Sequence, residues 1–188
     1  MPITALDPTT ALVVIDLQQG IVGRPLAHPT DPIVDRAATL ARAFRDRDLP
    51  VVLVNVAGAP PGRTDAGGPL DMSALPAEWT DLVAELDRDP GDILVTKYAR
   101  SAFTGTGLAE RLRAGGVTQV VVVGIATGVG VESTARDAHE QGFHVTLPVD
   151  AMTDSDAARH ERSIAHVFAS IAETGTTDDV LRHLSARS

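Results

Sequence analysis

Hydrophobic residues along this chain gather in two kinds of segment. Short apolar runs rich in β-branched residues alternate with longer stretches in which apolar positions recur with a helical period. The short runs are apolar on successive residues rather than on every second one, which is typical of strands covered on both faces in a parallel sheet. The predicted strands are 11–15, 51–56, 93–96, 117–123 and 143–149, and a short sixth strand is expected near 170–173.

The longer segments begin and end at residues that favour helix termini. Asp31 offers an N-cap and Pro32 suits the first helical position of a helix that reaches to about residue 47. Gly142 can adopt the left-handed conformation that ends a helix, which favours a helix over 129–141. The other predicted helices are 78–86, 108–114, a helix capped by Asp154 that reaches to about residue 168, and a terminal helix that begins at Thr176 or Thr177.

This alternation of strands and helices predicts the fold class. Right-handed crossovers place helices on both faces of the sheet, so we expect a three-layer α/β/α, Rossmann-like fold with an open parallel sheet of about six strands. The 188 residues fit a single domain, 1–188. Ligands of such folds bind beyond the carboxyl ends of the strands. The Gly- and Pro-rich segment 57–76 is long for a connection, and it is either a binding loop or a plain surface excursion.

Composition narrows the class of partner. The chain has 25 acidic and 16 basic side chains, and its net charge of -9 opposes binding to nucleic acid or to an anionic membrane. We therefore expect a small-molecule partner. The N-terminus does not have the pattern of a targeting signal and no apolar segment is long enough to span a bilayer, so we expect a soluble, cytoplasmic protein. The sequence has no cysteine, which excludes disulfides and thiolate nucleophiles.

Three polar features fall where this fold places its chemistry. Asp16 directly follows the first predicted strand, and Lys97 directly follows the third. Segment 124–138 joins a buried strand to a helix through several glycines, which allow close approach of a ligand to backbone N–H groups. Taken singly, each feature has a plain structural alternative: Asp16 can cap a turn, Lys97 can be solvated, and the glycines can serve close packing. A common cavity would make Asp16 an acid or base and Lys97 its cationic partner.

The same three segments carry a resemblance to a known family. ALVVIDLQ at 11–18, KYARSAF at 97–103 and GIATGVGVESTARDA at 124–138 resemble, in order and spacing, the signature segments of the isochorismatase-like hydrolases. The resemblance implies a six-stranded parallel sheet flanked by helices and assembly into a homodimer or a larger homo-oligomer. It also implies a cis peptide bond before Ala126, which would orient a backbone N–H into the site.

The resemblance further implies how the catalytic groups divide. Cysteine-bearing relatives use an Asp, a Lys and a Cys to open amides through a thioester; Asp16 and Lys97 match two of these, while Gly130 stands where the cysteine is expected. Family members that lack the cysteine hydrolyse a vinyl ether by acid catalysis, which makes Asp16 the expected proton donor. The alternative is a catalytically inactive member that binds a small molecule.

Substrate binding is expected to involve five further positions. Backbone N–H groups near Ala126 and Gly130, together with Lys97, can hold a carboxylate or an oxyanion. Arg63 and Arg100 are candidate carboxylate clamps, with solvation at the surface as their alternative. Thr127 could act as a nucleophile, but no adjacent base is visible in the sequence to activate it. The predicted substrate-binding residues are Ala126, Thr127, Arg63, Arg100 and Phe103.

Two departures from the family pattern limit the expected chemistry. The Asp and His ligands of the nicotinamidase-type metal motif are absent from segment 54–62, so we expect no catalytic metal and no cofactor. Ala126 also stands where some true isochorismatases have a tyrosine, which argues against isochorismate itself as the substrate.

Overall fold

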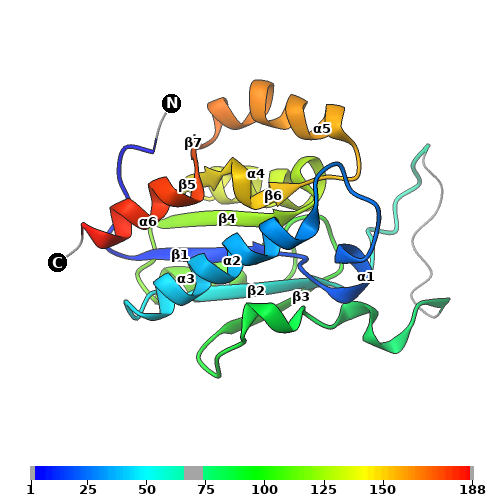
Figure 1. Ribbon diagram of the computed structural model, residues 1–188, viewed down its shortest axis with the longest axis horizontal. Coiled ribbons are helices and arrows are strands. Elements are labelled where there is room, and N and C mark those ends of the chain that lie inside the picture. The colour runs from blue at the N-terminus through cyan, green and yellow to red at the C-terminus, as the bar shows by residue number, and fades with distance from the viewer. Residues whose placement is uncertain (1–2, 66–73, 187–188) are drawn as a thin grey trace.

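A parallel β-sheet forms the centre of the molecule (Figure 1). The computed structural model describes residues 3–65 and 74–186. The sheet follows the order β3-β2-β1-β4-β5-β7, and β6 pairs with β4 beside this path. All of these pairings are parallel, which confirms the predicted fold class. The strands are β1 (Thr10–Ile15), β2 (Val51–Val56), β3 (Ile93–Lys97), β4 (Gln119–Ile125), β5 (His144–Pro148), β6 (Met152–Thr153) and β7 (Glu173–Gly175).

Helices cover both faces of the sheet. In Figure 1, α2 and α6 lie in front of the sheet, while α3 and α4 lie behind it. The helices are α1 (Gln19–Val22), α2 (Thr30–Arg45), α3 (Leu108–Ala114), α4 (Glu132–Glu140), α5 (Ala157–Arg162) and α6 (Thr177–Ser185). Short 3-10 turns span Ala77–Thr80, Ala84–Leu86, Val149–Ala151 and Phe168–Ser170, and π-helical turns span Thr127–Val131 and Ser163–Val167. Within the described residues, no helix combines the length and apolar character needed to cross a membrane.

The position of β1 in the sheet explains why its residues are apolar on successive positions. Ala11, Val13 and Ile15 pack into the core cluster that includes residues of α3 and α4. Leu12 and Val14 point to the opposite face and pack with residues of α2 and α6. Both faces of this strand are therefore buried, as the run of apolar residues predicts.

The segment 78–86 differs from the single helix that its sequence suggests. It forms two 3-10 turns, separated at Leu82 by an antiparallel bridge to Gln18. The Val83 N–H also donates to the Leu17 carbonyl. Hydrogen bonds to a distant part of the chain thus replace those of a continuous helix, and helix propensity alone does not capture such contacts.

Helix starts also differ in detail from their predicted positions. The side chain of Asp156, rather than that of Asp154, caps α5 by accepting the N–H groups of Ala158 and Arg159. Helix α2 begins two residues earlier than expected, with Pro29 rather than Asp31 at the N-cap position. The predicted start of the terminal helix is confirmed, because α6 begins at Thr177 and Thr176 forms a reciprocal capping box with Asp179. The sixth predicted strand lies slightly later, at β7.

Sheet order fixes where a ligand site can form. Strand β1 pairs with β2 on one side and with β4 on the other. The chain thus leaves β1 in one direction for β2 and β3, and later returns beside β1 as β4. Such a switch point opens a crevice at the carboxyl ends of the strands. Asp16 follows β1, and the glycine turn follows β4 at this same end.

Candidate active site

Asp16 occupies a strained position at the end of β1. Its backbone φ is 53°, in the left-handed region that residues other than glycine rarely adopt. The Asp16 N–H donates to the Val54 carbonyl of β2 over 2.9 Å, which ties the residue to the neighbouring strand. Backbone strain of this kind concentrates at functional sites, where the surrounding structure maintains it.

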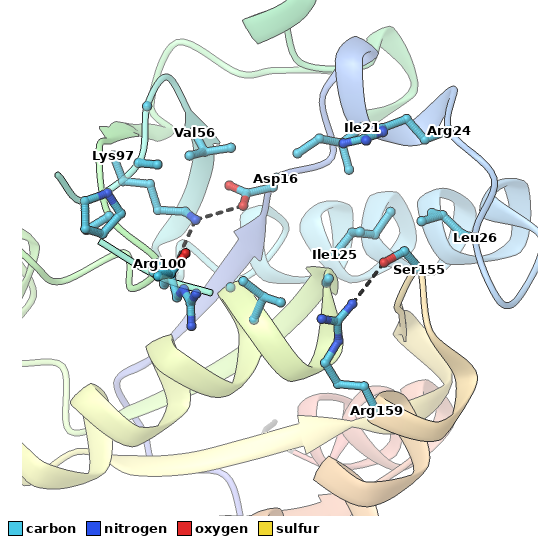
Figure 2. Close-up of a pocket in the computed structure, with 18 of the residues that line it drawn as sticks. Asp16, Ile21, Arg24, Leu26, Val56, Lys97, Arg100, Ile125, Ser155 and Arg159 are labelled. Carbon is cyan, nitrogen blue, oxygen red and sulfur yellow. Dashed lines mark hydrogen bonds and ion pairs between the residues drawn. The ribbon is translucent and has the colours of Figure 1, made fainter. Parts of the chain in front are cut away.

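Lys97 provides the counter-charge to Asp16 (Figure 2). Its Nζ lies 2.8 Å from Asp16 Oδ2, and the same Nζ donates to the Arg100 carbonyl over 3.0 Å. Lys97 ends β3, which is separated from β1 by β2, so the long lysine stem bridges that gap. Both side chains are buried, with 2% of Lys97 and 7% of Asp16 exposed. Lys97 is the chain's only lysine among sixteen basic residues, a sequence signal that supports a dedicated role.

The carboxyl group of Asp16 is poised to exchange a proton. Burial raises the pKa of Asp16 from 3.8 to about 6, although the charge and hydrogen bond of Lys97 act in the opposite direction. Its Oδ1 atom is buried and has no hydrogen-bond partner in the described part of the chain. One carboxyl oxygen is therefore anchored by Lys97, while the other is left to carry the proton.

The glycine turn after β4 closes against Asp16. The Ile125–Ala126 peptide bond is cis, as the family resemblance implies. Gly124 has a φ of 113°, and a Cβ there would lie 2.1 Å from the Ile15 carbonyl oxygen, so only glycine fits. A Cβ at Gly130 would lie 3.2 Å from Asp16 Oδ2 and 2.9 Å from Ile15 Cγ2. Asp16, Lys97 and the Gly130 turn therefore converge on one location.

A cavity of about 850 Å³ opens at this location. Its walls include Asp16, Lys97 and Gly130, and three more predicted residues also line it: Ala126, Arg63 and Arg100. Arg63 and Arg100 are exposed at the cavity surface. The described part of the long segment 57–76 contributes Gly58, Ala59, Pro60, Gly62, Arg63 and Thr64 to the wall, which supports its interpretation as a binding loop. Residues 66–73 of that segment lie outside the described residues.

The structure places two predicted substrate-binding residues away from the cavity walls. Phe103 is a core residue whose ring stacks on Phe143 at 5.8 Å, so its apolar side chain serves packing. Thr127 is fully buried, and its Oγ1 lies 2.8 Å from His160 Nδ1. A base is thus adjacent to Thr127 after all. The sequence did not reveal it because His160 lies 33 residues further along the chain.

Two cavity-lining arginines were not singled out from the sequence. Arg24 follows α1, and Arg159 belongs to α5; both contribute to the cavity walls. Neither residue lies in the three segments that carry the chemistry, and chain folding alone brings them to the crevice. In the sequence, an arginine on a helix and another in a loop look like ordinary solvated residues.

Among the residues that the structure describes, none form a metal-ligand cluster at this site. In residues 3–65 and 74–186, no group of three or more His, Cys, Asp or Glu side chains is arranged to hold a metal ion. The wall after β2 is built from Val56 and small loop residues such as Gly58 and Ala59. The described residues around the cavity thus do not form a cradle for a metal.

Comparison with known proteins agrees with this geometry. The model of the isochorismatase domain matches residues 10–179. The chain is 39% identical over 183 residues to the uncharacterized isochorismatase family protein YecD of Escherichia coli, covering 94% of this chain and 96% of that protein. It is 31% identical over 183 residues to a probable isochorismatase of Pseudomonas chlororaphis, covering 94% and 87%. A maleamate amidohydrolase of Pseudomonas putida is 30% identical over 190 residues, covering 93% and 88%.

A solved structure confirms the fold at the level of the whole chain. An isochorismatase family protein from Burkholderia thailandensis superposes with a TM-score of 0.90 and 38% sequence identity, covering 96% of this chain and 98% of that chain. The matched family model spans β1 through the start of α6 and includes every element that builds the cavity. This chain therefore belongs to the isochorismatase family, whose members are hydrolases with a three-layer α/β fold.

Proposed function

We propose that this protein hydrolyses the enol ether bond of a small anionic molecule by acid catalysis, with Asp16 as the proton donor. The observation that carries the proposal is the Asp16 carboxyl group itself. Its Oδ1 has no partner among the described residues, and burial raises its pKa to about 6. A carboxylic acid with such a pKa can donate a proton near neutral pH and regain it from water.

The reaction can be written with every atom balanced. The Asp16 carboxylic acid protonates the terminal methylene of an enol ether, which leaves an oxocarbenium ion and an Asp16 carboxylate. Water adds to the cationic carbon and returns one proton to Asp16. The resulting hemiketal collapses: its hydroxyl proton moves to the ether oxygen, the C–O bond to the alcohol breaks, and a ketone forms. The net change is the consumption of one water molecule.

Two features around Asp16 support this route over a covalent one. The chain has no cysteine, so a thioester intermediate on a thiolate is excluded. Gly130 lines the cavity and adds no side chain beside Asp16 Oδ2, so no protein nucleophile stands next to the acid. We infer that Gly130 takes the place of the family's nucleophilic cysteine, and that acid chemistry survives because it never depended on sulfur.

The charge of the cavity supports an anionic substrate. Five cationic side chains line the cavity, namely Arg24, Arg63, Lys97, Arg100 and Arg159, while Asp16 is the acidic residue among the described lining residues. The protein as a whole carries a net charge of -9, so this local excess of cations does not follow from composition. Nearby donors act strongly on a ligand, whereas distant surface charges are screened by salt.

The alternative function is a ligand-binding protein without turnover. The buried Lys97–Asp16 ion pair favours this alternative, because two opposite charges that balance each other can form part of a binding site without any proton transfer. The two functions differ in what Asp16 must do. A proton donor is indispensable for turnover, whereas a wall residue changes only affinity.

An assay panel separates the two functions. Purified protein is incubated with isochorismate, other enolpyruvyl ethers and small amides, while pyruvate and ammonia release are followed by coupled assays. We expect pyruvate release from at least one ether, reduced about 10²- to 10⁴-fold in Asp16→Asn. Asp48→Asn is the matched control, since Asp48 is an exposed aspartate with a similar φ of 54°. Ligand affinity without any turnover would favour the binding protein.

A further inference from the structure

Arg159 lies across the cavity from the Lys97 side chain. In Figure 2, Lys97 and Arg100 stand on one side of Asp16, whereas Arg159 and Ser155 stand on the other. All five residues line the cavity. The proposed proton donor therefore lies between two groups of cationic or polar side chains that can contact a ligand.

A buried carboxylate holds the Arg159 guanidinium in place. Asp154 Oδ1 accepts hydrogen bonds from Arg159 Nε at 3.0 Å and from Nη2 at 2.6 Å. Asp154 is fully buried, and Ser155 Oγ lies 2.9 Å from the same Nη2. Burial raises the pKa of Asp154, but hydrogen bonds from Arg159 and Gly128 outweigh that effect and keep its pKa below the ordinary value. Asp154 thus stays ionised and fixes the arginine.

The Asp154 carboxylate also connects Arg159 to the glycine turn after β4. Asp154 Oδ2 accepts the Gly128 N–H over 2.8 Å. Gly128 also makes room for the arginine stem, because a Cβ at this position would lie 2.4 Å from Arg159 Cγ. Arg159 is therefore built into the turn that carries Gly130, two residues further along. This position differs from that of a freely solvated surface arginine.

One end of the guanidinium remains available to a ligand. Nε and Nη2 contact Asp154 and Ser155, whereas Nη1 has no hydrogen bond to any residue that the structure describes. The side chain keeps 37% of its surface exposed. Two N–H groups of a fixed cation thus face the side of the cavity opposite Lys97, where they match an anionic oxygen.

We propose that Arg159 is a specificity-determining residue that binds a second anionic group of the substrate. The substrate then carries two carboxylates or comparable anions, one near Lys97 and Arg100 and one at Arg159, with the reacting bond beside Asp16 between them. This inference rests on the proposed function for its assignment of the reacting bond. The binding of a second anion at Arg159 can be measured without any turnover.

Calorimetric titration with two matched pairs of probes tests this inference. Isophthalate is compared with benzoate, and fumarate with crotonate; within each pair only the dianion can reach both sides of the cavity. We expect at least one dianion to bind wild-type protein about tenfold or more tightly than its monoanion, the effect of one charge-assisted hydrogen bond. Arg159→Gln brings the affinity for the dianion down to that for its monoanion, while benzoate or crotonate still binds on the Lys97 and Arg100 side, which a general loss of structure would not allow.

The controls make each outcome decisive. Arg162→Gln alters another arginine of the same helix, which is exposed and lies outside the described cavity wall, and it keeps the preference. Arg159→Lys keeps the positive charge but loses the paired N–H donors of the guanidinium, so this variant retains part of the preference for the dianion. Equal affinities within both pairs for wild-type protein would overturn the inference, and so would a preference that persists in Arg159→Gln. An Arg159-dependent preference in a protein that turns over no enol ether would refute the proposed function alone.

Discussion

Lys97 Nζ holds Asp16 Oδ2 at 2.8 Å, while Asp16 Oδ1 has no hydrogen-bond partner among the described residues. The pair is buried, and breaking such a pair leaves an uncompensated charge in a low-dielectric environment. The ammonium therefore both orients the carboxyl group and limits how far burial raises its pKa. These two effects can be separated by experiment.

Lys97→Met tests the role of the cation. Removing it takes away the interactions that lower the pKa of Asp16, so this pKa rises above about 6. The folded variant then binds a proton that the unfolded chain has already released, and its stability falls as the pH rises through the new pKa. We expect a loss of about 3 to 5 kcal/mol in the free energy of unfolding at pH 8 and a smaller loss at pH 5. Urea unfolding at both pH values measures it, and equal losses would count against this account.

Gly130→Ala tests the close packing of the glycine turn against the acid. The added Cβ would lie 2.9 Å from Ile15 Cγ2 and 3.2 Å from Asp16 Oδ2, so either the turn or the carboxyl group must shift. We expect a stability loss of about 1 to 3 kcal/mol and a drop in turnover. Gly62→Ala is the matched control, because Gly62 lines the same cavity but a Cβ there meets nothing within 4 Å. Similar effects of both substitutions on turnover would show that Gly130 has no special role.

The next prediction concerns the pKa of His160, which lies apart from the Asp16 carboxyl group. Burial lowers the pKa of His160 and the charge of His28, whose ring lies 4.8 Å away, lowers it further, while Asp154 and Glu161 act in the opposite direction. The folded state thus disfavours protonation, and the stability that neutral His160 contributes is present above pH 6.5 and lost as the pH falls below it.

NMR titration of the imidazole resonances measures this effect directly. We expect the His160 midpoint to lie below the ordinary 6.5 and to move upward in His28→Gln, which removes the neighbouring charge. A His160 midpoint at or above 6.5 would contradict the predicted effect of burial.

Much of the fold could be predicted because both local and global signals agree. The apolar run of β1 is buried on both faces, as its pattern indicates. The prediction of one helix over 78–86 was wrong because Leu82 pairs with Gln18 instead. That pairing depends on where the chain passes after β1, which no local pattern encodes.

The residues of the candidate site also fall into those that the sequence could reveal and those that only the folded chain shows. Asp16 and Lys97 could be singled out because they lie at the ends of two strands, and strand ends meet at one edge of the sheet. Gly130 could be singled out only through the family resemblance, which places it where the cysteine is expected. Phe103 was misassigned because its position in a signature segment does not say which way its ring points, and the ring packs into the core. Arg159 was missed because its role depends on contacts with Asp154 and Gly128 that only the folded chain creates.

The pH dependence of kcat/KM for an enol ether substrate tests the central role of Asp16 most directly. A proton donor acts in its protonated form, so the rate is constant below the Asp16 pKa of about 6 and falls about tenfold per pH unit above it. Lys97→Met should move this descending limb to higher pH. A rate that instead rises with pH to a plateau above 6 would show that the carboxylate form is active and would contradict the assignment of Asp16 as the acid.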